Sequence, residues 1–232
     1  MQAKVSREEM SDTTSAGGKI LPRSCYARPT VAVALDLLGR ILLQRSPEGI
    51  AAGKIVEVEA YFHGDPSSHS TYRKNESTAV IWGKPGVAYV YLNYGMYHCL
   101  NVVTEPAGRA GCVLIRALEP TAGIPLMELR RHTTDLYNLA RGPGKLTRAL
   151  AITAEDNGAD FTHGPLLIRD NREDFEIVVA TRIGLSRAVN EPLRFFIKDN
   201  RCVSFPNKGK RFLEGTVEEV KEAFLRGTLK TG

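Results

Sequence analysis

Three charged residues stand inside apolar, strand-like runs of this sequence, where charge is unusual. Glu57 and Glu59 interrupt the run "KIVEVEAY", and Arg116 interrupts "CVLIRAL". Side chains two residues apart in a strand point to the same side, so the two carboxylates should share one face with Ile55. A buried carboxylate is costly unless it is paired, hydrogen-bonded or used for chemistry. The pattern therefore allows two interpretations: a structural ion pair with Arg116, or a general base that Arg116 orients.

Tyrosines gather near these charges in the sequence. Tyr61 follows Glu59 by two residues, and Tyr89 and Tyr91 lie two apart in "AYVYLN". Tyrosines in strands most often pack within the sheet, and an isolated histidine is more often structural than functional. As a group, however, these side chains offer the flat faces and hydrogen-bonding groups that suit a pocket for a planar heterocycle. The group consists of Tyr61, His69, Tyr89, Tyr91, Tyr94, Tyr97 and Asn101.

Two further stretches place unusual residues in expected turns. In "VYLNYGMYHCLN" two strand halves meet at Asn93-Tyr94-Gly95, so an aromatic ring occupies a hairpin tip, where small polar residues are usual. It could serve a partner or simply pack on a neighbouring loop. In "RGPGKLTRAL" a Gly-Pro-Gly sequence precedes a predicted helix, with Arg141 and Lys145 beside its start. Such a start can hold a phosphate, although many bind nothing.

Composition limits the partners and the compartment. The chain has 232 residues, of which 43% are hydrophobic, and 31 Lys+Arg against 26 Asp+Glu give a net charge of +5. This mild basic excess permits a polyanionic partner without requiring one. The four cysteines, Cys25, Cys99, Cys112 and Cys202, form no C-x-x-C pair, so we expect neither a metal site nor a disulfide framework. The N-terminus lacks the apolar segment of a secretory signal, and no apolar run is long enough to span a bilayer; we expect a soluble intracellular protein.

The predicted elements favour an α+β domain built around an antiparallel sheet. Residues 1–20 are polar and rich in Ser, Thr and Gly, and are expected to be a disordered tail. One domain should follow over 21–210, and the C-terminal segment 211–232 should be mainly helical and pack on the domain or trail from it. Expected helices are a short one from Pro29-Thr30 to Leu38, ended by Gly39, and two in "GIPLMELRRHT" and "KLTRALAI". Expected strands are 40–45 and 49–62, with further β-rich runs in "VAYVYLNYGMYHCLNVVT", "GCVLIRALEP", "EIVVATRIGL" and "LRFFIKD".

Several long blocks, in order, resemble the alkyladenine (3-methyladenine) DNA glycosylase family. They are "VEVEAY", "KPGVAYVYLNYGMYHCLNVV", "GCVLIRALEP", "GPGKLTRALAI" and "ATRIGLS…EPLRFF", and they cover roughly residues 21–205. The resemblance implies a single compact domain with a curved, mainly antiparallel sheet flanked by helices, from which one hairpin protrudes and inserts into DNA. It also implies no metal and no organic cofactor.

The resemblance assigns roles to individual positions. Glu59 matches the catalytic carboxylate, and Arg116 matches the arginine that helps to position the attacking water. Tyr61, His69 and Tyr91 match the pocket around the extruded base, Asn101 matches the side chain that crowds a guanine 2-amino group, and Ile183-Gly184 match the pocket floor. The hairpin tip Tyr94-Gly95-Met96 matches the part that enters the minor groove, and Arg141 and Lys145 are expected to contact DNA.

The implied activity is base-excision repair of alkylated or deaminated purines in double-stranded DNA, by a monofunctional enzyme that leaves an abasic site. We expect an intracellular monomer, in the cytoplasm or nucleoid, or in the nucleus of a eukaryote. Two other classes stay open at this point. A lesion-binding protein without catalysis would have no need of Glu59 beside Arg116, and a nucleoside hydrolase should be indifferent to salt.

Overall fold

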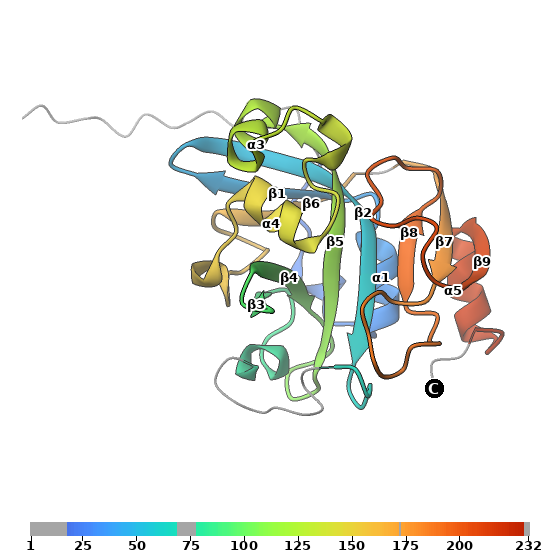
Figure 1. Ribbon diagram of the computed structural model, residues 1–232. Coiled ribbons are helices and arrows are strands. Elements are labelled where there is room, and N and C mark those ends of the chain that lie inside the picture. Colours follow the sequence, from blue (N-terminus) through green and yellow to red (C-terminus); the bar gives the residue numbers. More distant parts are fainter. Residues whose placement is uncertain (1–17, 69–77, 172, 230–232) are drawn as a thin grey trace, which may run out of the picture.

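Strand β2 (Gly49–Phe62) is the centre of the fold, because it pairs with β1, β5 and β8. The computed structural model describes residues 18–68, 78–171 and 173–229 (Figure 1). Its nine strands form one antiparallel sheet with the order β3-β4-β5-β2-β8-β7-β9, and β1 and β6 extend the sheet beside β2. This is the α+β class that the sequence predicts. The other strands are β1 (Ile41–Ser46), β3 (Ala88–Asn93), β4 (Tyr97–Val103), β5 (Gly111–Ala122), β6 (Leu166–Arg169), β7 (Glu176–Ala180), β8 (Arg194–Ile197) and β9 (Arg211–Thr216).

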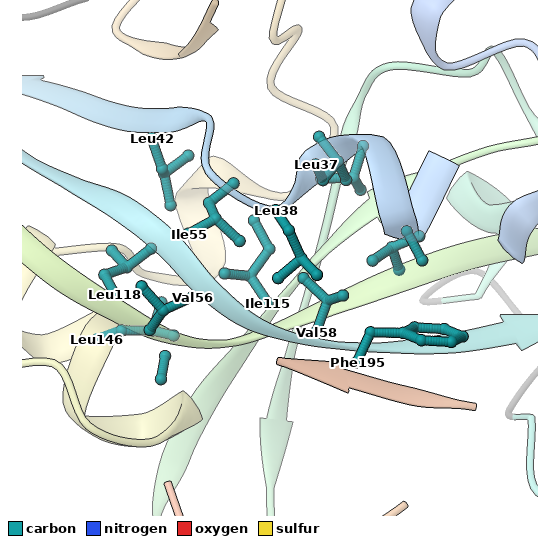
Figure 2. Packing of buried hydrophobic residues seen from close by; sticks show 14 of the residues in the cluster. Leu37, Leu38, Leu42, Ile55, Val56, Val58, Ile115, Leu118, Leu146 and Phe195 are labelled. Atoms are coloured by element: carbon teal, nitrogen blue, oxygen red, sulfur yellow. The ribbon is translucent and has the colours of Figure 1, made fainter. Parts of the chain in front are cut away.

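Helices cover the sheet where its side chains are apolar. Helix α1 (Thr30–Leu37) packs on β2 and β5, and Gly39 just after it has a φ of +79°, as expected of a glycine that ends a helix. The helices α3 (Ile124–Arg131), α4 (Pro143–Leu150) and α5 (Val217–Leu225) follow, and α4 packs on β4. Figure 2 shows that α1, α4 and the central strands contribute to one core. Its members include Leu37, Leu38, Leu42, Ile55, Val56, Val58, Ile115, Leu118, Leu146 and Phe195.

Simple alternation fails at one point in β2. The pairing of β2 with β5 shifts register between Ile55 and Glu57, and again between Glu57 and Val58. Strict alternation from Ile55 to Glu59 therefore does not hold, and Ile55 is buried in the same cluster as Val56 and Val58. The physical reason is the irregular pairing, which changes how successive residues face the sheet.

The chain ends differ partly from expectation. The predicted tail lies mostly outside the described residues, but Gly18 donates a backbone hydrogen bond to Asp170 and Ile20 bridges to Arg169, so the described residues 18–20 lie beside β6. The sequence predicts a mainly helical segment over residues 211–232, but its first residues, 211–216, are not helical. They form β9, which pairs with β7, and only then does helix α5 begin. Residues 211–216 are therefore part of the sheet, and the helical part of the segment is α5.

Candidate active site

A cavity of about 290 Å³ opens where β2, β4 and β5 meet the loop after β7. Most of the residues that the sequence selects come together here. The cavity is lined by Glu59, Tyr61, Ser67, Ser68, Ile81, Tyr89, Tyr91, Asn93, Tyr94, Tyr97, Cys99, Asn101, Cys112, Leu114, Arg116, Pro143, Ile183, Gly184, Leu185 and Phe205.

Glu59 is the carboxylate of this cavity, and three donors hold it. The Tyr61 hydroxyl donates to Oε2 over 2.8 Å, and the backbone N–H of Ile183 donates to Oε1 over 2.7 Å. Arg116 Nη1 lies 3.2 Å from Oε2. Glu59 is fully buried, so these three contacts repay the cost of its burial and fix its direction.

Arg116 bridges both carboxylates that the sequence singles out. Its Nε lies 3.0 Å from Glu57 Oε1, while Nη1 reaches Glu59. Burial by itself lowers the pKa of this guanidinium, but the charges of Glu59 and Glu57 outweigh burial and hold the pKa above its usual value. Arg116 thus forms the buried ion pair that the first interpretation of the sequence pattern expects, and it also contacts the carboxylate on the cavity wall.

Tyr61 lies between two charged groups. The guanidinium carbon of Arg182 lies 4.6 Å from the centroid of its ring, and Arg182 Nη2 pairs with Asp65 Oδ1 over 3.1 Å. Burial, followed by the charge of Glu59, raises the pKa of the Tyr61 hydroxyl well above its usual value. The hydroxyl therefore stays protonated and remains a hydrogen-bond donor.

The other aromatic wall comes from β3. Tyr89 and Tyr91 stack with ring centroids 5.3 Å apart, and both line the cavity.

Two cysteines, on β4 and β5, also line the cavity. Burial raises the pKa of Cys99 to about 11, with its other contacts secondary, and raises the pKa of Cys112 to about 12. These cavity thiols are therefore protonated near neutral pH and have little nucleophilic character.

Asn101 is buried on β4 with its amide fixed. Its Nδ2 donates to the carbonyl of Tyr89 over 3.1 Å, and its Oδ1 lies 3.8 Å from the sulfur of Cys112. The Ile183-Gly184 pair, expected at the pocket floor, also lines the cavity. Gly184 has a φ of +78°, in the region that favours glycine.

Tyr94 lies in the turn that joins β3 to β4, where the last pair of the ladder is Asn93 with Tyr97. The Tyr94 side chain is 74% exposed, and so is that of Met96. The Tyr94 backbone has a φ of +50°, which costs a non-glycine residue about 1–3 kcal/mol when it is held there by its surroundings. A surface aromatic that packs on a neighbouring loop would be covered, and this ring is not.

The Gly-Pro-Gly stretch has a packing role. Tyr97 lies against Gly144 so closely that a Cβ there would be 2.5 Å from the ring Cγ. The base of the hairpin therefore rests on the start of α4. Arg141 donates from Nε to the carbonyl of Val203 over 2.8 Å, and Lys145 donates to the side chain of Asn138. Burial, followed by the charges of neighbouring arginines, lowers the pKa of Lys145.

His69 lies outside the described residues. The expected absence of a metal remains a prediction, and in the described part of the chain no group of three or more His, Cys, Asp or Glu side chains could hold a metal ion. Over the same residues, no helix is long and apolar enough to cross a membrane.

The sequence alone did not identify Arg194 and Ser204, which are the other partners of Glu57. Arg194 is fully buried, and its Nε lies 2.7 Å from Glu57 Oε1. Ser204 donates from its backbone N–H to Glu57 Oε2 over 2.7 Å. The only signal in the sequence was one charged residue at the start of the apolar run "RFFI", and nothing local connected it to Glu57.

Comparisons with known proteins show which family this chain belongs to. Residues 24–201 match the model of a family described as methylpurine-DNA glycosylase (MPG). A Methanoculleus marisnigri protein named "Putative 3-methyladenine DNA glycosylase" is 48% identical over 189 residues, which cover 79% of this chain and 98% of that protein. Proteins with the same name from Rhodopseudomonas palustris and Carboxydothermus hydrogenoformans are 46% and 45% identical, covering 84% and 80% of this chain and 92% and 98% of their own lengths. This chain therefore belongs to the methylpurine-DNA glycosylase family, and it is a DNA glycosylase of base-excision repair.

Proposed function

We propose that this enzyme hydrolyses the N-glycosidic bond of alkylated or deaminated purines in double-stranded DNA, with a water that Glu59 activates. The observation that carries the proposal is the geometry of Glu59, a carboxylate on a cavity wall with its direction fixed by Tyr61, Ile183 and Arg116. The product would be a free base and an abasic site.

The cavity suits a single extruded base. Its volume of about 290 Å³ is small for a ligand pocket, and tyrosines supply flat walls. A purine alkylated at N3 or N7 carries positive charge, and an aromatic face attracts such a cation by about 0.5–2 kcal/mol, depending on desolvation. The fixed amide of Asn101 would crowd the 2-amino group of a normal guanine. Selection would thus combine attraction to the damaged base with exclusion of an undamaged one.

The chemistry would need little acid catalysis, because alkylation already weakens the glycosidic bond. Glu59 would take a proton from water, and its charge would stabilise the oxocarbenium-like sugar. Arg116 would help to position that water. No lysine lines the cavity among the residues that the structure describes, and we propose direct hydrolysis without a covalent sugar intermediate.

The hairpin tip would replace the extruded nucleotide. Flipping costs a few kcal/mol, less for a damaged base that pairs badly. The exposed Tyr94 ring, with Gly95 and Met96 beside it, would enter the minor groove and offset this cost, as apolar wedges of other minor-groove proteins do. Arg141 and Lys145, near the start of α4, would contribute positive charge toward the phosphates. We propose that the enzyme acts as a monomer, inside the cell where the DNA is.

The decisive experiment compares wild type and Glu59→Gln on a duplex that contains one 3-methyladenine or hypoxanthine, under single-turnover conditions. Gln can still accept the Ile183 hydrogen bond but cannot take a proton, so base release should fall by about 10²–10⁴-fold. Binding to the lesion duplex should persist. Glu222→Gln, at an exposed ion pair on α5, is the matched control and should behave as wild type.

Each contrary outcome has a clear meaning. Base release by Glu59→Gln at the wild-type rate would refute the catalytic assignment. Lesion binding by wild type without any release of free base would favour a non-catalytic lesion-binding protein. Activity on free nucleosides that does not weaken as salt rises would favour a nucleoside hydrolase, because binding to DNA falls steeply with salt.

A further inference from the structure

Phe205 is a second exposed aromatic residue on the cavity wall. Its side chain is 59% exposed, and it lines the same cavity as Glu59 and Tyr94. Its backbone φ is +49°, a conformation that bulky residues rarely adopt. A bulky apolar side chain that is exposed, strained and placed at a site is a candidate for ligand contact.

The buried ion pairs of Glu57 with Arg116 and Arg194 are connected to the backbone of Phe205. Arg194 Nη2 donates to the carbonyls of Ser204 over 2.8 Å and of Phe205 over 3.0 Å. The N–H of Ser204 donates to Glu57, and Glu57 also forms ion pairs with Arg116 and Arg194. The backbone that carries the exposed ring is therefore fixed by hydrogen bonds to Arg194 and Glu57, and Glu57 also contacts Arg116, the arginine beside Glu59.

The hairpin tip and Phe205 reach the cavity from different parts of the strand order. In the strand order β3-β4-β5-β2-β8, the hairpin β3-β4 is next to β5. The segment that carries Phe205 follows β8, the strand on the other side of β2 (Figure 1). Glu59 and Arg116 lie on β2 and β5, between them. A nucleotide extruded into the cavity would thus have exposed aromatic residues near it from two separate segments of the chain.

The surroundings of Phe205 carry positive charge. Lys208 places its Nζ 5.4 Å from the centroid of the Phe205 ring, and the Lys208 N–H donates to the Phe205 carbonyl over 3.0 Å. Lys208 and Lys210 are exposed. An aromatic face beside cations is the combination that binds the bases and phosphates of a nucleic acid strand.

We propose that Phe205 stacks on the nucleotide next to the extruded one, on the side away from Tyr94, while Lys208 contacts a phosphate of the same strand. The enzyme would hold the damaged strand from both sides of the gap. This inference rests on the proposed function, because it assumes an extruded nucleotide in the cavity.

The first test measures binding to a duplex with one abasic site, and excision of 3-methyladenine in parallel. Loss of base stacking typically weakens binding enough that Phe205→Ala should raise Kd about tenfold. Phe205→Gly should weaken binding equally while keeping or raising Tm, because glycine tolerates a positive φ. The control is Leu225→Ala, at an 86% exposed position on α5, which should leave Kd and Tm unchanged.

The second test detects the contact directly. The chain has one tryptophan, Trp82, so its fluorescence is the background for Phe205→Trp and for Leu225→Trp. Abasic duplex should quench the tryptophan at position 205 and leave the one at position 225 unquenched. Equal signals from both, or wild-type Kd for both Phe205→Ala and Phe205→Gly, would overturn the inference. Base release by wild type would then still support the proposed function. Absence of base release would refute that function, whereas the quenching experiment would still report whether position 205 contacts DNA.

Discussion

Glu57 and Glu59 are the same residue type two positions apart on β2, yet their surroundings differ. Both are fully buried, and both contact Arg116. Glu57 is enclosed by Arg116, Arg194 and the N–H of Ser204, and does not line the cavity. Glu59 is held by three donors but stands on the cavity wall. Two buried carboxylates on one strand thus differ in whether they stand on a cavity wall, which is the basis for proposing a structural role for Glu57 and a reactive role for Glu59.

The largest expected effect separates the two carboxylates by stability. Glu57→Ala leaves the buried cations Arg116 and Arg194 without their shared partner, and removal of one member of a buried ion pair costs about 3–5 kcal/mol. Glu59→Gln keeps an acceptor for the Ile183 N–H and should cost less. Chemical denaturation of both variants measures the free energy of unfolding. Equal losses from the two changes would remove the distinction between anchor and reactive group.

A smaller effect sharpens the account of Glu59. Tyr61→Phe removes the hydroxyl that donates to Glu59 Oε2 and keeps the ring beside Arg182. Hydrogen bonds to charged groups contribute about 1.5–3 kcal/mol, so base release in a single turnover should slow by at least about tenfold. The unfolding free energy should change less than in Glu57→Ala. If the rate stays at wild type, Tyr61 does not orient the carboxylate.

The smallest effect concerns Asp160, an anchor carboxylate that does not line the cavity. Burial raises the pKa of Asp160, but hydrogen bonds from Thr162 and Arg23 outweigh it and lower the pKa to about 2. A lowered pKa in the folded state gives stability that is present above the unfolded value and lost as pH falls through the folded value. Asp160→Asn should therefore lower Tm at pH 6, and its difference from wild type should vanish between about pH 4 and pH 2. A difference that does not change with pH would assign the effect to packing.

Much of the fold follows from local pattern. The strand 49–62 and the helix that ends before Gly39 agree with the structure because periodicity and a glycine after the helix are local properties. The errors have longer-range causes. Alternation does not predict the arrangement around Ile55 and Glu57, because register shifts between β2 and β5 cannot be seen in one strand. The helical prediction for 211–232 holds for α5 but not for 211–216, because the pairing of those residues with β7 comes from the tertiary structure.

The candidate site divides in the same way. The motif resemblance selected Glu59, Arg116, Tyr61 and Tyr91, and the structure places all four around one cavity. It did not select Arg194 or Phe205. Their significance depends on contacts across the chain, such as the hydrogen bond from Arg194 to Glu57 over a separation of 137 residues.

The sequence alone determined which residues can do chemistry and which of them share a strand, because side-chain alternation and residue type are local. Only the tertiary structure decided that Glu57 is enclosed and that Glu59 faces a cavity. The physical reason is that the groups surrounding these carboxylates come from distant segments: Ile183 is 124 residues from Glu59, and Ser204 is 147 residues from Glu57. Those contacts form only when the sheet is assembled, so no pattern within β2 can record them.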